Sequence, residues 1–218
     1  GGFSAGSSIE QLAYDGENLS RAGDVVVVSV NHRLNVLGYL DLSPFGEKYQ
    51  DSANAGNLDL IAALEWIRDN IEGFGGDPEN VTLFGQSGGG VKVWSLLQMP
   101  EADGLFHKGI IESGVVDPDL LGDIEDGNGR EIVKAMLVEL GLEEKDVDQL
   151  ETLPYDQLAQ AYENAALKVA QKGEYVGNHP HKNQSYFGDA IKHGFREETK
   201  KIPLLIGTCL LYTSDAAD

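Results

Sequence analysis

The sequence predicts an α/β fold built on a mostly parallel sheet with helices on both faces, and three observations carry that prediction. Short runs of β-branched residues alternate with longer segments of helical periodicity. The resulting order of strand, helix, strand, helix, strand requires right-handed crossovers, which make neighbouring strands parallel. The 218 residues, 41% hydrophobic and 24% charged, are enough to bury a core of this kind.

The expected elements follow one another over the first half of the chain. Val25–Val30 is a β-branched run and predicts a strand buried on both faces. From about Ala53 to Glu72 apolar residues recur at helical spacing, and glycines then end the predicted helix. Val81–Phe84 and Lys108–Glu112 predict two further strands, and the helix between them is stopped by Pro100.

Beyond the third visible strand the sequence predicts a helical excursion. Arg130–Leu140 and Asp156–Lys172 have the pattern of amphipathic helices. Tyr175–Phe195 is predicted to be irregular, and Ile202–Gly207 returns to a strand pattern. Such an excursion forms either a cap or gorge wall over a catalytic sheet or simply additional packing helices, and both interpretations stay open.

Composition limits the classes of partner. A net charge of −20 argues against nucleic acid and anionic membranes, because both would repel the chain. No apolar run approaches the roughly 20 residues that span a bilayer. His179 and His181 have no third ligand at metal-binding spacing, so no metal or cofactor is expected. Cysteine is absent before position 209, which favours a reducing compartment such as a bacterial cytoplasm.

A short glycine-rich motif carries the predicted chemistry. Residues 85–89 read Gly-Gln-Ser-Gly-Gly, follow a predicted strand and open a predicted helix, which is the context of a nucleophile elbow. Ser87 is therefore the candidate nucleophile, and Gly85 and Gly89 are expected to leave room for the tight turn. The N–H of Gly88 lies at a helix N-terminus, where it can stabilise an oxyanion.

The second part of an oxyanion hole is expected from a glycine-rich loop earlier in the chain. The backbone N–H groups of Gly1 and Gly2 are the candidates, because this loop precedes the strand predicted at Val25–Val30.

Several longer segments occur in an order that resembles a known family. The chain is similar to the type-B carboxylesterases, which include bacterial p-nitrobenzyl esterases, lipases and cholinesterases. The resemblance is dense from Gly1 to about Gly114 and thin from there to Lys201. The segments that carry it are residues 2–7, 30–38, 55–59, 63–67, 74–85 and 112–114.

The resemblance implies an α/β-hydrolase fold and a serine esterase that acts on small-molecule esters without a cofactor. It assigns Ser87 as the nucleophile and the N–H groups of Gly1, Gly2 and Gly88 as a three-donor oxyanion hole. Two positions depart from the family pattern of Glu, Ser, Ala. Gln86 drops a charge, and Gly88 keeps the donor N–H but loosens the backbone.

The resemblance also implies that the catalytic acid and histidine lie outside this chain. The family acid, a Glu, would follow Thr208 within about five residues, and the histidine would come much later. Residues 1–208 are therefore expected to be a partial catalytic domain, truncated at both ends and inactive alone. Residues 209–218 resemble the translation of a sequencing-library adapter and are expected to be a non-native tail.

Two other functions remain as alternatives. Some members of this fold are non-catalytic adhesion or binding modules, although these usually lose the nucleophile. Another hydrolase on the same fold, such as a peptidase, is the second alternative. Ser113, which follows the third predicted strand, is either a hydrogen-bonding residue close to the triad or an ordinary strand-end serine.

Overall fold

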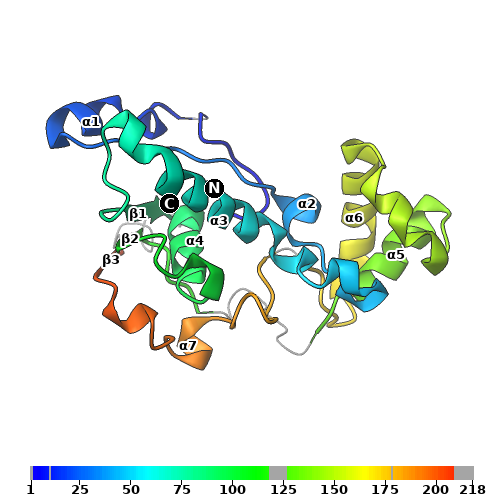
Figure 1. The fold of residues 1–218 in the computed structure, drawn as a ribbon. Coiled ribbons are helices and arrows are strands. Elements are labelled where there is room, and N and C mark those ends of the chain that lie inside the picture. Colours follow the sequence, from blue (N-terminus) through cyan, green and yellow to red (C-terminus); the bar gives the residue numbers. More distant parts are fainter. Residues whose placement is uncertain (1, 10, 118–126, 178, 209–218) are drawn as a thin grey trace, which may run out of the picture.

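The computed structural model describes residues 2–9, 11–117, 127–177 and 179–208 and contains a three-stranded parallel sheet flanked by helices (Figure 1). The strands β1 (Thr82–Gln86), β2 (Lys108–Glu112) and β3 (Leu204–Gly207) lie in that order in the sheet. The helices are α1 (Glu17–Gly23), α2 (Asn35–Tyr39), α3 (Ala55–Asn70), α4 (Gly88–Leu96), α5 (Arg130–Leu140), α6 (Tyr155–Ala170) and α7 (Ala190–His193). Short 3₁₀ segments occupy Leu12–Tyr14, Ser43–Phe45, Glu47–Tyr49, Ser52–Asn54, Ile71–Phe74, Pro100–Ala102, Glu144–Glu151 and Thr199–Lys201.

Most of the predicted elements are present. Helices α3, α5 and α6 lie within two residues of their predicted limits, and β2 has the predicted bounds. The glycine signals act as expected, because Gly141 follows α5 with a left-handed φ of 70°. Helix α4 ends at Leu96, before the Pro100 that was expected to stop it. The predicted non-native tail, residues 209–218, lies outside the described residues, so its origin stays a prediction.

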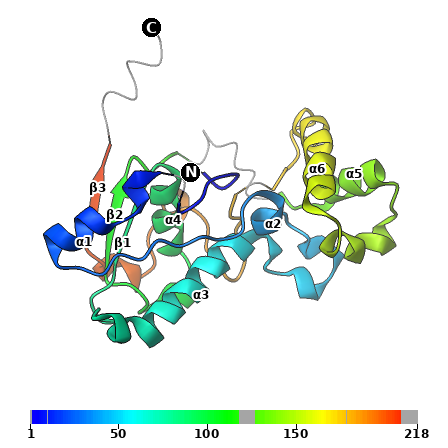
Figure 2. The same ribbon diagram turned by 90° about the horizontal axis from the view of Figure 1, so that it is seen from above.

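The prediction of a strand at Val25–Val30 was wrong. This segment is extended (Figure 2), but it forms no ladder with any strand in the described part of the chain. Val25 and Val28 are 46% and 40% exposed, and the carbonyl of Val25 accepts instead from the Ser20 hydroxyl (2.8 Å). The β-branched run therefore favours an extended backbone, but a strand also requires a neighbouring strand with which it can form hydrogen bonds. Consequently the helical excursion follows the second strand of the observed sheet and not the third.

One face of the sheet carries the first hydrophobic core. The register pairs Leu83 with Gly109 and Gly109 with Leu204, so these three residues lie in one row across this face of the sheet. Ile111, fully buried, packs there against α4 and belongs to the same hydrophobic cluster as the buried residues of α3. The opposite face presents Phe84, which is 55% exposed. Packing is thus concentrated on the side of the sheet where α4 begins.

A second hydrophobic core lies in the helical excursion. Helices α5 and α6 pack on each other at the end of the molecule away from the sheet (Figures 1 and 2). Met136 is fully buried between them, and Val36 of α2 closes the same cluster. The buried residues of this cluster are Val36, Leu40, Tyr49, Ile132, Val133, Met136, Leu137, Val147, Leu150, Leu158, Ala161, Tyr162, Ala165 and Val169.

A salt bridge ties the extended segment after α1 to helix α3. The guanidinium of Arg33 donates to both carboxylate oxygens of Asp59, at 2.7 and 2.8 Å, and the Arg33 N–H donates to the same group at 2.9 Å. Burial raises the pKa of Asp59, but these bonds outweigh that effect and hold the pKa below its ordinary value. The pair thus fixes where the chain enters α2.

Asp59→Asn is expected to lower the free energy of unfolding by about 1 kcal/mol at neutral pH, a value limited by solvent screening of the half-exposed pair. Because the folded-state pKa is lowered, the stabilisation is complete above the ordinary carboxylate pKa and is lost as the pH falls through the lowered one. Urea unfolding at pH 7 and pH 3 should show the difference between variant and wild type shrinking in acid. Asp69→Asn, which removes the exposed pair with Arg68, is the control; a difference independent of pH would contradict the assignment.

Candidate active site

Ser87 occupies the sharp turn between β1 and α4. Its backbone has φ 53° and ψ −122°, a left-handed conformation that is costly for a residue with a side chain. The turn is held from both sides: the Ser87 N–H donates to the carbonyl of Glu112 at 2.8 Å, and the Ser87 carbonyl accepts from Val91 N–H at 3.0 Å. Ser87 is exposed, whereas Gly88 after it is buried. The geometry is that of a strained turn that presents a serine outward.

Backbone-to-backbone packing makes this turn possible. A Cβ built on Gly85 would lie 2.3 Å from the carbonyl carbon of Gly89. A Cβ on Gly114 would lie 2.5 Å from the Cα of Gly90, and one on Gly90 would lie 2.9 Å from the Cα of Gly114. The first turn of α4 therefore rests directly on the end of β1 and on the residues that follow β2.

Gly89 contributes differently from the sequence-based expectation. A Cβ at Gly89 would meet no atom of the described residues within 4 Å, so the structure has room for a small side chain at this position. Its backbone instead fills the space beside Gly85. Gly90 and Gly114 are crowded positions that the G-x-S-x-G motif does not include. A glycine run extending past the motif, and the glycine after Ser113, were the available signals.

Gly88 is the first residue of α4, so its N–H has no acceptor within the helix. It keeps the position that was predicted for an oxyanion donor. Gly1, another predicted donor, lies outside the described residues. Gly2 lies against α4, because its carbonyl accepts a hydrogen bond from the Lys92 ammonium at 2.9 Å. The structure therefore brings the glycine-rich loop and the helix behind Ser87 into contact.

The residue after Gly2 anchors the same loop to α2. The carbonyl of Phe3 accepts from the Asn35 N–H at 2.8 Å, and its ring packs edge-on against Tyr39, with centroids 4.9 Å apart. Tyr39 is fully buried, and its hydroxyl donates to the side-chain carbonyl of Asn57 at 3.1 Å. Burial raises the pKa of Tyr39, so the hydroxyl remains a neutral donor. A buried polar network thus supports the loop from beneath.

The histidines serve structural contacts in the described residues. His32 lies 2.7 Å from the Arg33 carbonyl, and its pKa is lowered by burial and then by the charge of Lys92. His107 accepts from the Val81 N–H at 3.2 Å, and His181 packs on the ring of Tyr175 with centroids 4.5 Å apart. No group of three metal-ligating side chains occurs within the ranges that the structure describes.

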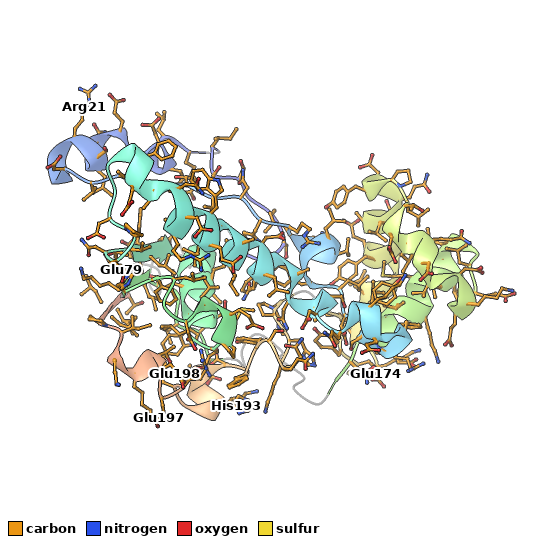
Figure 3. All side chains as sticks on the ribbon, in the orientation of Figure 1. Arg21, Glu79, Glu174, His193, Glu197 and Glu198 are labelled. Atoms are coloured by element: carbon orange, nitrogen blue, oxygen red, sulfur yellow. The ribbon has the colours of Figure 1, made fainter. Side chains whose placement is uncertain are left out.

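His193 is also remote from Ser87. It lies at the edge of the molecule in the neighbourhood of Glu197 and Glu198 (Figure 3). The next residue, Gly194, accepts from Gln98, just past the carboxyl end of α4, whereas Ser87 is at the amino end. Nine helical residues separate those ends by about 13 Å.

Ser113 occupies the end of β2 with a left-handed φ of 51°, and its N–H donates to the carbonyl of Gly207 at 2.7 Å. Its backbone therefore links β2 to β3 at the same edge of the sheet as Ser87. Ser113 was predicted either as a residue close to the triad or as a strand-end serine, and its place at this edge is compatible with both.

Gly85→Ala and Gly89→Ala form a matched pair that tests the packing of the turn. In an esterase that carries this chain, the Gly85 variant is expected to lose at least about 100-fold in kcat, because its methyl group displaces the backbone that orients Ser87. The Gly89 variant should retain the wild-type thermal transition, since alanine favours the helix and meets open space. Assay with a soluble ester and thermal unfolding check both; equal damage in the two variants would contradict this packing.

Comparison with known proteins agrees with this geometry. The model of the carboxylesterase family matches residues 1–211. The para-nitrobenzyl esterase of Bacillus subtilis is 39% identical over 231 residues, which cover 99% of this chain and 44% of that protein. The chain thus spans less than half the length of this relative.

None of the helices in the described part of the chain is long and apolar enough to cross a bilayer.

Solved structures give the same result. An esterase from anaerobic Clostridium hathewayi, described as able to hydrolyse aliphatic aromatic polyesters, superposes with a TM-score of 0.91 at 58% identity over 95% of this chain and 41% of that one. A thermophilic p-nitrobenzyl esterase superposes with a TM-score of 0.81 at 36% identity, over all of this chain and 44% of that one. The chain belongs to the carboxylesterase family and has part of an α/β-hydrolase fold.

Proposed function

We propose that the protein carrying this chain is a serine carboxylesterase in which Ser87 is the nucleophile. The observation that carries the proposal is the left-handed backbone of Ser87, held between β1 and α4 by glycine-to-glycine packing. The strained backbone of Ser87 lowers the stability of the fold, and a residue with only a structural role would not require such strain. Membership of the carboxylesterase family makes ester hydrolysis the reaction to test.

The reaction proceeds by acyl transfer in two steps. The Ser87 Oγ attacks the ester carbonyl carbon, its proton passes to a general base, and the carbonyl electron pair moves onto oxygen. Collapse of this tetrahedral intermediate expels the alcohol, which takes the proton, and leaves an acyl group on Ser87. Water then attacks the acyl-enzyme in the same manner and releases the acid. The base and its orienting acid are those expected outside this chain.

The developing oxyanion needs donors that are already in place. The N–H of Gly88, unpaired within the helix, is one proposed donor, and the N–H of Gly2 in the loop against α4 is another. Gly1 is the third donor implied by the family resemblance. Loss of one such donor typically costs about 10²- to 10³-fold in rate.

Ser87→Ala in a full-length protein is expected to abolish ester turnover and covalent labelling by a fluorophosphonate. Ser43→Ala is the control, because Ser43 is exposed and lies in the 3₁₀ segment Ser43–Phe45, away from the sheet. Labelling and turnover of the Ser43 variant should match the wild type. Labelling at another serine that survives in the Ser87 variant would sink the assignment.

An aliphatic aromatic polyester is a second candidate substrate. The observation that favours it is 58% identity, over 95% of this chain, to the Clostridium hathewayi esterase described as able to hydrolyse such polymers. A full-length enzyme is then expected to release soluble monomers from a polyester film as well as to cleave a p-nitrophenyl ester. Product analysis of the supernatant checks this, with Ser87→Ala as control. Turnover of the soluble ester without release from the film would exclude the polymer.

A parallel assay with a peptide substrate separates the alternatives. A peptidase would cleave the peptide, whereas a carboxylesterase would leave it intact. A non-catalytic binding member would show no labelling at Ser87 and no turnover of either substrate.

A further inference from the structure

Lys92 connects the two structural elements that carry the proposed oxyanion donors. It lies four residues after Gly88 on α4, so the two residues share one face of the helix. From there its ammonium donates to the carbonyl of Gly2 at 2.9 Å. The same ammonium lies over the ring of Phe3, 5.2 Å from the centroid. One side chain thus binds two successive residues of the glycine-rich loop.

The loop needs such a restraint. Gly2 has no side chain, and a Cβ built there would meet no described atom within 4 Å, so side-chain packing does not restrict rotation at this residue. Its carbonyl is held by Lys92, and the next carbonyl, of Phe3, is held by Asn35. Because a peptide group is planar, fixing the Gly2 carbonyl also fixes the peptide that joins Gly2 to Phe3. The N–H of Gly2 belongs to the preceding peptide, but it extends from the Cα of Gly2, and that Cα is fixed relative to α4 when the Gly2–Phe3 peptide is anchored.

We propose that Lys92 is a positioning residue that sets the N–H of Gly2 relative to the N–H of Gly88, so that both donors face the same oxyanion. This inference rests on the proposed esterase function and extends it to a residue outside the nucleophile motif. Lys92 acts through the backbone and does not touch the substrate.

The surroundings of Lys92 are consistent with this role. Burial lowers the pKa of Lys92 to about 8, so holding the charge at this place has a cost. Burial, and then the charge of Lys92, lower the pKa of His32, on the segment before α2. Arg33, which follows His32 in the sequence, is neutralised by its salt bridge with Asp59. A partly desolvated ammonium that hydrogen-bonds a backbone carbonyl has the features of a candidate functional residue.

The test is a comparison of Lys92→Met, Lys92→Arg and Lys108→Met in a full-length enzyme. Lys92→Met is expected to lower kcat about 10- to 100-fold while KM changes less than about threefold, because the oxyanion exists only in the transition state. Inhibition by a trifluoromethyl ketone, whose adduct carries the same oxyanion, should weaken by the same factor. Lys92→Arg should recover most of the loss, since a guanidinium still donates to the carbonyl. Lys108, bonded to Asn80 at the far end of β2, is the control lysine and should leave kcat unchanged.

Three results would overturn the inference. They are unchanged kcat in Lys92→Met, a change confined to KM, or an arginine variant as slow as the methionine variant at equal thermal stability. If Lys92→Met does not fold, Lys92→Gln replaces it in the same comparison. An inactive wild type would instead count against the proposed function; amide exchange at Gly2 and Phe3 then tests the restraint by itself, and equal exchange in wild type and variant would refute it.

Discussion

The contact on which the rest of the site depends is the packing of glycine backbones at the carboxyl ends of β1 and β2. Gly85 lies against Gly89, and Gly90 lies against Gly114, at distances that leave no room for a Cβ at Gly85, Gly90 or Gly114. This close approach lets α4 begin directly after β1 and forces Ser87 into its left-handed backbone. The hydrogen bond from Ser87 to the Glu112 carbonyl then joins the turn to the neighbouring strand. Strain at one residue is thereby balanced by contacts among several others.

Much of the fold could be predicted from the sequence where local pattern and tertiary role agree. The helical spacing of Leu60, Leu64, Ile67 and Ile71 matches the buried stripe of α3 and the turn after it. Gly141 ends α5 at the expected position, whereas α6 ends at Ala170, before the Gly173 that was expected to stop it. The G-x-S-x-G motif placed Ser87 between a strand and a helix, because the chemistry of that turn restricts residue type as well as position.

What the sequence could not supply was pairing between distant segments. The valines from Val25 to Val30 specify an extended backbone, but a ladder needs a neighbour that no local pattern reveals. Lys92 was overlooked for a similar reason: a lysine in a helix normally reaches solvent, and only the fold brings it to the Gly2 carbonyl. Likewise the contact between Gly90 and Gly114 joins segments that are far apart in the sequence, and only the fold reveals it.

Helices α5 and α6, together with residues in and after α2, form a hydrophobic core that shares no buried residue with the core under the sheet. Substitutions inside one cluster therefore need no compensation in the other, and the two can accumulate changes at different rates. The α5–α6 pair can therefore change in sequence and shape while the serine turn keeps its geometry. This independence gives the α5–α6 insertion the character of an evolutionary module.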